Sequence, residues 1–185
     1  MDKPIRLRLT KLDVARRQLD AALEMWFHYC DPVPIHTLAS AAHEVFAYLC
    51  KHKGLPPLMF DPALCRPGKA GLVKAALHRH YNFFKHSNTD PDATTEFPPE
   101  TSEAFIYMGI EGWRTLGGER RELDDAFTLF FLMRHPDLHS VDTPERVEHF
   151  ILMTELAQMM PLGDRAEFLR DYQLWCRRVR DARGA

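Results

Sequence analysis

The sequence predicts an all-α protein, a bundle of about seven helices, and three observations support this fold class. Apolar residues recur three and four positions apart along most of the chain, which is the spacing of one face of an α-helix. Segments rich in proline or glycine separate these periodic stretches. Thr10, Thr143 and Asp164 each precede such a stretch, and threonine and aspartate favour the N-terminal cap of a helix.

Three helices are predicted in the first half of the chain. The first follows Thr10, which forms a capping pair with Asp13, and its periodic run ends at Asp31-Pro32. The second extends over residues 34–54 and the third over residues 69–85. The segment between these two is expected to be an irregular loop because it contains Pro56, Pro57, Pro62 and Pro67.

Four more helices are predicted in the second half. A loop over residues 87–100, with three prolines and several turn-forming residues, separates them from the first three. The predicted helices cover residues 102–116, 119–134, 143–160 and 164–181. The third of these opens with a proline in its first turn, and the last begins at Asp164 with a glutamate three positions later.

A single domain is expected to include all 185 residues, because a chain of this length can bury one good core. Within it we expect a core at residues 10–134 and a C-terminal helical extension at residues 143–181. Apolar residues make up 45% of the chain and aromatic residues 11%, values typical of folded proteins, so disorder is not expected. The aromatic side chains at helical core spacing are expected to be buried rather than to stack on bases: Trp26, Phe27, Phe83, Phe84, Phe127, Phe130 and Phe131.

The charges nearly balance, with 24 Lys and Arg against 26 Asp and Glu, for a formal charge of −2. This balance excludes a general binder of polyanions, so any contact with nucleic acid needs a local patch. Residues 61–90 contain five basic residues and two acidic ones, whereas residues 96–125 contain three basic and eight acidic. The two segments are either solvated faces or complementary patches that pair within one molecule or between two.

The four cysteines, Cys30, Cys50, Cys65 and Cys176, are far apart and form no Cys-x-x-Cys pair. This pattern is typical of small buried thiols in a reducing compartment. The N-terminal residues lack the apolar run of a signal peptide. The longest strongly apolar run, residues 126–133, is too short to span a bilayer. We therefore expect a cytoplasmic protein without membrane contact.

The main candidate for chemistry lies in the third predicted helix. Arg79 and His86 stand seven residues apart, almost two helical turns, so their side chains project from one stripe. Asn82 lies on the same stripe, at the border of the apolar face that includes Ala76, and Tyr81 is expected on the opposite, wetter side. A guanidinium, an amide and an imidazole in this order could hold a phosphate and move a proton. The structural alternative is a helix edge, where the arginine snorkels and the histidine helps to end the helix.

Residues 79–86, Arg-His-Tyr-Asn-Phe-Phe-Lys-His, resemble the signature of HEPN domains, small helical bundles that are often dimers. In that signature an arginine, usually followed by a polar residue, is separated from a histidine by four to six intervening residues. His80 takes the polar place here, and six residues separate Arg79 from His86. Active HEPN domains are metal-independent ribonucleases.

By this resemblance, Arg79 holds the scissile phosphate, and His86 acts as general base or acid while the 2′-OH of RNA attacks. Asn82, Lys85 and His80 would add contacts to the RNA or nucleotide, and a homodimer would bring two copies of the site together. Residues 12–19, 31–37 and 81–86 also resemble a bacterial family of helical proteins without an assigned activity. That second resemblance implies no function.

His36 and His43 are a second candidate site, seven residues apart on the second predicted helix, with Ser40 between them. Their stripe consists of small residues and lies apart from the face expected to meet the core, which is formed by Leu38, Ala42, Val45, Phe46 and Leu49. Such a stripe suits close helix packing, a pocket for a small ligand or partner, or a metal site completed by other helices. The chain contains neither Glu-x-x-His nor His-Glu-x-x-His, so neither a metal nor a cofactor is predicted.

Three functions remain open on the sequence alone. The first is a HEPN-like protein that binds RNA or a nucleotide and cleaves RNA without a metal. The second is a non-enzymatic helical binding or scaffolding protein, with the acidic residues 96–125 facing a protein partner. The third is a metal-dependent helical-bundle enzyme that uses His36 and His43. The first two differ in whether Arg79 and His86 converge in an open cleft or are buried apart.

Overall fold

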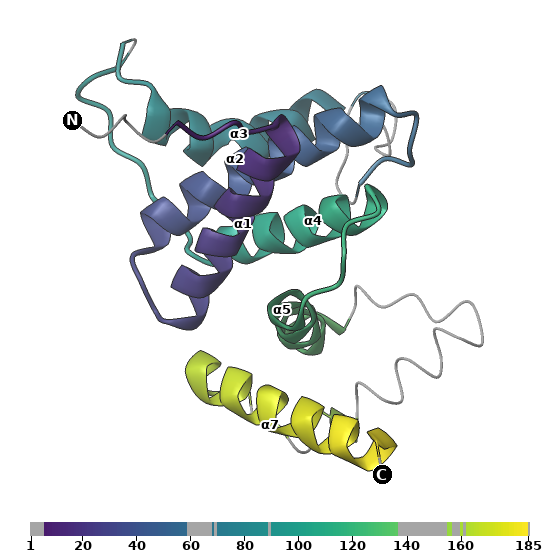
Figure 1. The fold of residues 1–185 in the computed structure, drawn as a ribbon. Helices are drawn as coiled ribbons and strands as arrows, with labels where there is room; N and C mark the ends of the chain where they lie inside the picture. The colour runs from purple at the N-terminus through teal and green to yellow at the C-terminus, as the bar shows by residue number, and fades with distance from the viewer. Residues whose placement is uncertain are drawn as a thin grey trace, which may run out of the picture. The chain divides into compact units, whose positions relative to one another are not determined.

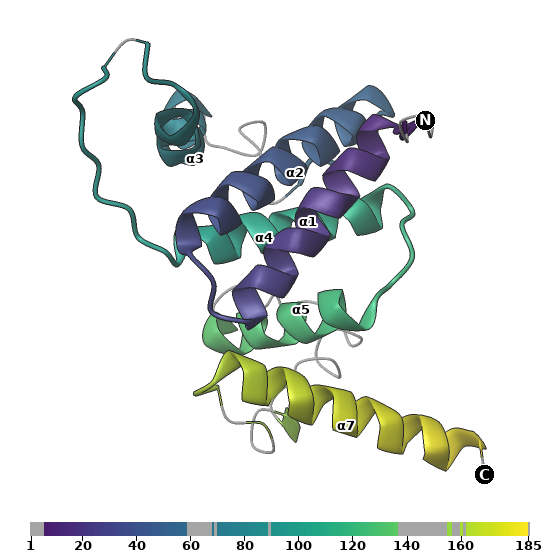
Figure 2. The ribbon, with the colours of Figure 1, turned by 60° about the vertical axis from the view of Figure 1, so that its left-hand side comes forward.

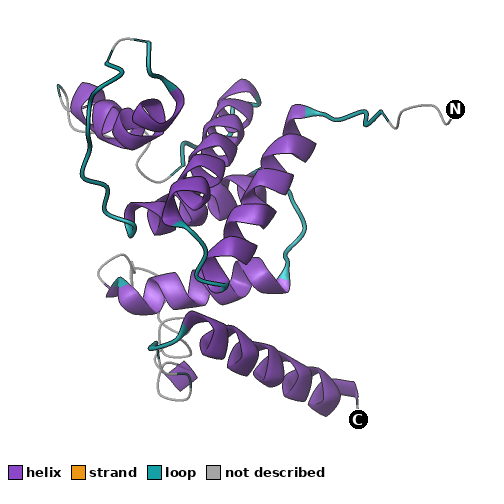
Figure 3. Ribbon diagram, turned by 90° about the vertical axis from the view of Figure 1, so that its left-hand side faces the viewer, coloured by secondary structure: helices purple, strands orange, loops and turns teal. Residues whose placement is uncertain are grey.

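The structure, a computed structural model, contains helices and no strand among the residues that it describes (Figure 3). The described residues are 6–58, 68, 70–88, 90–136, 155–156, 160 and 162–184. Their six helices, labelled in Figure 1, are α1 (Lys11–Phe27), α2 (Pro32–His52), α3 (Ala70–Lys85), α4 (Thr101–Thr115), α5 (Glu122–Arg134) and α7 (Arg165–Gly184). The all-α prediction is confirmed for this part of the chain, and most of the helix predicted at residues 143–160 lies outside it.

Local side-chain chemistry accounts for where the helices begin. At α1 the Thr10 hydroxyl accepts a hydrogen bond from the Asp13 amide at 3.1 Å, and the Asp13 carboxylate accepts one from the Thr10 amide at 2.8 Å. At α7 the Asp164 carboxylate accepts a hydrogen bond from the Glu167 amide at 2.8 Å. α5 begins three residues later than predicted because Arg121 is extended, with φ −123° and ψ 144°.

The chain divides into two compact units, which we describe separately. The first unit consists of Met1–Ala22 and Pro32–Gly118, and the second of Leu23–Asp31 and Glu119–Ala185. In the first unit α2 packs along α4 and also contacts α3, and Figure 2 shows α3 end-on beside α2. In the second unit α5 packs against α7.

Glycine in α4 lets the helices of the first unit approach closely. A Cβ atom added to Gly112 would lie 2.7 Å from the Cβ of Phe46 and 3.0 Å from a methyl of Leu58. A Cβ at Gly109 would lie 3.1 Å from a methyl of Leu19. The core of this unit includes Leu19, Ile35, Ala39, Ala42, Phe46, Phe105, Ile106 and Ile110, all buried.

An aromatic core holds the second unit together. The ring of Trp26 lies 4.8 Å from that of Phe127 and 5.0 Å from that of Phe130, in both cases edge to face. Phe130 in turn contacts Phe168 of α7, with ring centroids 5.1 Å apart. The Arg165 guanidinium lies over the Trp26 ring, 4.2 Å from its centroid. The aromatic side chains predicted to be core residues are confirmed here as packing residues.

Two predictions about individual side chains are wrong. Tyr81 was expected on the wetter side of α3, but it is only 9% exposed, because the buried stripe passes through His80 and Tyr81 rather than through Ala76, which is exposed. Cys30 is exposed rather than buried, because it follows the turn that ends α1. Cys50 is buried as expected.

The second helix buries only two of the five residues predicted to face the core, Ala42 and Phe46. Leu38, Val45 and Leu49 are only partly buried, whereas the small-residue stripe that includes His36 and Ser40 lies in the interior. The physical reason is that α4 and α3 both pack on α2, so a single apolar stripe does not define its buried surface. Among the described residues, no helix combines the length and the apolar character needed to cross a bilayer.

Candidate functional site

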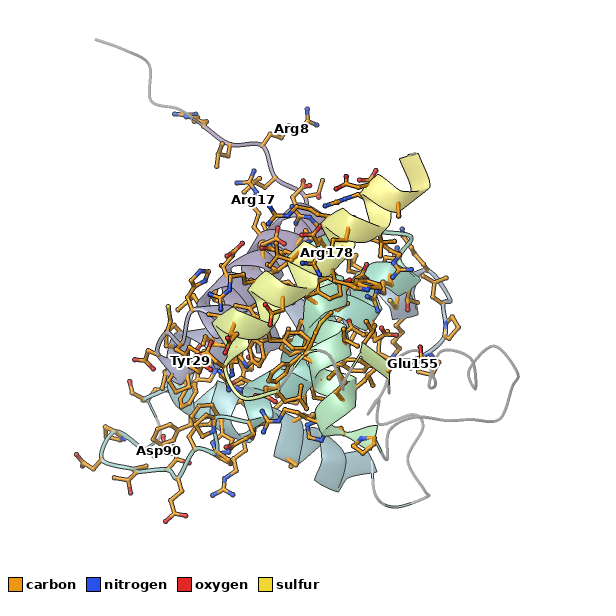
Figure 4. All side chains as sticks on the ribbon, turned by 90° about the horizontal axis from the view of Figure 1, so that it is seen from below. Arg8, Arg17, Tyr29, Asp90, Glu155 and Arg178 are labelled. Atoms are coloured by element: carbon orange, nitrogen blue, oxygen red, sulfur yellow. The ribbon has the colours of Figure 1, made fainter. Side chains whose placement is uncertain are left out.

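A pocket of about 580 Å³ lies in the first unit, between the C-terminal half of α3 and the loop that follows it. This volume falls within the usual range of small-molecule sites, roughly 300–1,000 Å³. One side, the helix wall, consists of Arg79, Asn82, Phe83 and His86. The other side, the loop wall, consists of Asn88, Asp90, Ala93, Thr94 and Thr95. Figure 4 labels Asp90 on this loop.

The helix wall is a consequence of helical geometry. Its residues are spaced by three, four and seven positions, which places their side chains on one stripe. α3 ends at Lys85, but the His86 amide still donates a hydrogen bond to the Asn82 carbonyl at 3.0 Å. That bond continues the helical pattern by one residue and keeps His86 in line with Arg79.

The polar groups of the helix wall are available to a ligand. The side chains of Arg79, Asn82 and His86 are exposed. No hydrogen bond or ion pair joins any of the three to another residue that the structure describes. Phe83 is half-buried in the same wall and offers a ring surface to the pocket. The helix wall thus presents a guanidinium, an amide, an imidazole and an aromatic ring together.

The loop wall contributes groups of a different kind. Asn88, Asp90, Thr94 and Thr95 offer an amide, a carboxylate and two hydroxyls. A turn shapes this wall, because the Ala93 amide donates a hydrogen bond to the Asp90 carbonyl at 3.0 Å. The pocket therefore pairs a cationic helix wall with a loop wall that carries one carboxylate and three neutral groups able to donate and accept hydrogen bonds.

α3 is attached to the unit through a set of buried and half-buried rings that we call the histidine–phenylalanine cluster. It consists of His36 from α2, His80 and Phe84 from α3, Phe97 from the loop and Phe105 from α4. The ring centroid of His36 lies 5.0 Å from those of Phe97 and Phe105, 5.7 Å from that of Phe84 and 6.2 Å from that of His80. His80 and Phe84 also lie 5.2 and 5.1 Å from Phe97.

The two histidines of this cluster are held as neutral rings. His36 is fully buried, and neither of its ring nitrogens has a hydrogen-bond partner among the described residues. Burial, reinforced by the neighbouring His80, lowers the pKa of His36 to about 4. Burial also lowers the pKa of His80, with a further contribution from the adjacent Arg79 guanidinium. An apolar ring cage thus surrounds polar groups that it cannot solvate.

The structure brings together three of the five residues predicted at the main site. Arg79, Asn82 and His86 line the pocket. Lys85 is not among the lining residues, and its ammonium lies 3.3 Å from the ring centroid of Tyr81. His80 is 8% exposed and belongs to the histidine–phenylalanine cluster instead.

The second candidate site is placed in the interior of the unit. Ser40 is buried and its hydroxyl donates a hydrogen bond to the His36 carbonyl at 2.6 Å. The ring of His43 is half-buried and lies 5.6 Å from that of Phe105. Within the described part of the chain, no three His, Cys, Asp or Glu side chains gather closely enough to hold a metal ion.

Sequence reasoning missed the whole loop wall. Asn88, Asp90, Thr94 and Thr95 were assigned only to an irregular loop, and their types are common in turns that have no other role. Phe83 was assigned to the core and lines the pocket as well. A usable signal was the concentration of hydrogen-bonding side chains directly after a helix that ends in the candidate histidine.

Comparisons of this chain with protein-family models, with curated proteins and with solved structures give no significant match. The function is therefore argued from the chemistry of the pocket. The eight-residue HEPN resemblance adds a hypothesis about what that chemistry does.

Proposed function

We propose that this protein is a HEPN-like RNA-binding protein that takes a nucleotide of single-stranded RNA into the pocket and cleaves the chain there without a metal ion. The proposal includes a cytoplasmic homodimer with a HEPN-like core. One observation carries it: Arg79, Asn82 and His86 line a single pocket, and their side chains form no hydrogen bond or ion pair with another described residue. The same residues form the signature that resembles HEPN domains.

The helix wall suits a phosphate. The Arg79 guanidinium has the planar geometry that matches two phosphate oxygens. The Asn82 amide can donate a further hydrogen bond to the same group. His86, one helical turn beyond Asn82, can take the proton of a 2′-OH or return one to the leaving 5′-oxygen. Cleavage by this route leaves a 2′,3′-cyclic phosphate and a 5′-OH.

The rest of the pocket suits the sugar and the base. The half-buried Phe83 ring offers a stacking surface, which is worth roughly 1–3 kcal/mol for a single-stranded base. The loop wall offers acceptors to the donors of a ribose or a base edge. An acidic residue in the pocket, Asp90, suits recognition of one nucleotide better than attraction of a long polyanion.

The test is RNA cleavage by metal-free protein, with wild type compared with His86→Ala and Arg79→Ala. We expect wild type to release 2′,3′-cyclic phosphate ends and each variant to be slower by roughly 10²–10³-fold. Lys85→Ala is the matched control, since it removes a cation from the same helix outside the pocket. Absence of cleavage by all four proteins, each correctly folded, would remove the catalytic role. Binding without cleavage would leave the binding protein as the function.

A further inference from the structure

The helix wall and the loop wall of the pocket are both connected to the rest of the unit through contacts with His36. His80 and Phe84 project from α3, the helix that carries Arg79, Asn82 and His86. Phe97 lies two residues beyond Thr95, where the loop wall ends. All three pack against His36, which α2 supplies, and α4 closes the far side of His36 with Phe105.

We propose that the histidine–phenylalanine cluster is the joint that fixes the helix wall against the loop wall, and that mild acid opens the pocket by protonating its buried histidines. The inference rests on the proposed function only for what the pocket binds, and it makes His36 and His80 positioning residues of that site. The joint itself is argued from packing alone.

The packing explains why this joint is sensitive to protons. His36 is fully buried, and its two ring nitrogens find no hydrogen-bond partner among the described residues. The same holds for Nδ1 of His80. A neutral imidazole can be buried against three phenylalanine rings at modest cost, but burial of an imidazolium without a hydrogen-bond partner is strongly unfavourable because its charge loses hydration. The free-energy cost of protonating these histidines is therefore relieved only when the rings separate and water enters.

Among the described residues, no neighbouring charge offsets that cost. The charged residues adjacent in sequence to the packed rings are Arg79 beside His80, Lys85 beside Phe84 and Glu96 beside Phe97, and Glu103 lies two residues before Phe105. His43 is the other titratable group on this stretch of α2, and its ring lies against Phe105. Within the described chain none of these groups is hydrogen-bonded to the His36 ring. His80 disfavours a positive charge on His36, and Arg79 disfavours one on His80.

The experiment is amide hydrogen exchange of the full-length protein at pH 7.5 and pH 5, expressed as protection factors so that the intrinsic rates cancel. For wild type, we expect the opening constant of residues 75–97 to rise about thirtyfold at pH 5, the ratio given by the lowered pKa of His36. Residues 165–184 serve as the internal reference. Unchanged protection of residues 75–97 would overturn the proposal.

Two variants assign the effect to the joint. His36→Phe keeps a ring in the cage but cannot be protonated, so most of the pH dependence should disappear, leaving only that of His80. His36→Leu provides a second uncharged side chain if the larger ring disturbs packing. His52→Phe removes an exposed histidine from the end of the same helix and should retain the full wild-type response. An undiminished response in both His36 variants would also overturn the proposal.

Binding of a short 2′-O-methyl RNA, which cannot be cleaved, separates this inference from the proposed function. If the joint and the RNA site are both correct, affinity falls at pH 5 for wild type and falls less for His36→Phe. If residues 75–97 open in acid but the RNA binds at neither pH, the joint stands and the RNA proposal fails. If the RNA binds equally at both pH values while those residues open, the joint does not position the site.

Discussion

The ring of His36 on α2 lies 6.2 Å from the ring of His80 on α3, at an interplanar angle of 82°, in the interior of the first unit. His80 is the immediate neighbour of Arg79, which lines the pocket. A single step along the chain therefore links a buried, neutral ring to an exposed cation. This relationship connects the stability of the unit with the geometry of its candidate site.

Stability should fall on mild acidification. The fold lowers the pKa of His36 from 6.5 to about 4, so the folded state favours the neutral ring. Its contribution is fully present above pH 6.5 and is lost as the pH falls from 6.5 towards 4. The loss amounts to roughly 3 kcal/mol, at 1.36 kcal/mol per pKa unit. Urea unfolding followed by circular dichroism across this range checks it, and a flat profile for wild type would contradict it.

Gly112→Ala should destabilise the first unit by about 1–3 kcal/mol, because the new methyl would lie 2.7 Å from the Cβ of Phe46 where α4 meets α2. Gly71→Ala is the matched control, since a Cβ at that exposed position of α3 meets nothing within 4 Å. The control should be neutral or slightly stabilising, by roughly 0.5 kcal/mol. Thermal unfolding of both variants measures the difference. Equal stabilities would show that the close approach of α2 and α4 is wrong.

Tyr29→Phe should destabilise the second unit by about 1 kcal/mol. The Tyr29 hydroxyl accepts a hydrogen bond of 2.7 Å from the Arg165 amide, which lies in the first turn of α7, where amides have no intrahelical acceptor. Tyr48→Phe removes a hydroxyl from a side chain that is 69% exposed and should have no effect. Trp26 fluorescence should report the change, because the Arg165 guanidinium lies over its ring. A neutral Tyr29→Phe would exclude this capping contact.

RNA binding should depend on salt in a way that distinguishes the two cations of α3. If Arg79 holds a phosphate, Arg79→Ala reduces the slope of log K against log salt by about 0.7, the value for one contact with a single strand. Lys85→Ala should leave the slope unchanged, because its ammonium lies over the Tyr81 ring. Fluorescence anisotropy with a 2′-O-methyl RNA at several salt concentrations measures both slopes. A larger change for Lys85→Ala would reverse the assignment of the two residues.

Local geometry made part of the site predictable from sequence. Helical periodicity alone places Arg79, Asn82 and His86 on one stripe, and the structure brings these three to one pocket. The capping pair of Thr10 and Asp13 was equally predictable from the sequence, because it involves residues three positions apart. Wherever the determining contacts lie within two helical turns, the sequence was informative.

Tertiary contacts account for what could not be predicted. Burial of His36 depends on Phe97 and Phe105, which arrive from distant segments and cover a stripe that looks polar by itself. Tyr81 is buried for a similar reason, since the direction from which α2 meets α3 is not encoded in the periodicity of α3. The loop wall is set by how residues 88–97 return to the cluster, and no local pattern specifies that path.

The most direct test of the central claim is a chemical-shift map of the ¹⁵N-labelled protein titrated with a short 2′-O-methyl RNA. We expect the largest chemical-shift changes on residues 79–95, with the side-chain signals of Asn82 and His86 among them. Arg79→Ala should abolish these shift changes. Changes centred on another surface, or none at RNA concentrations in the millimolar range, would contradict the assignment of this pocket as the RNA site.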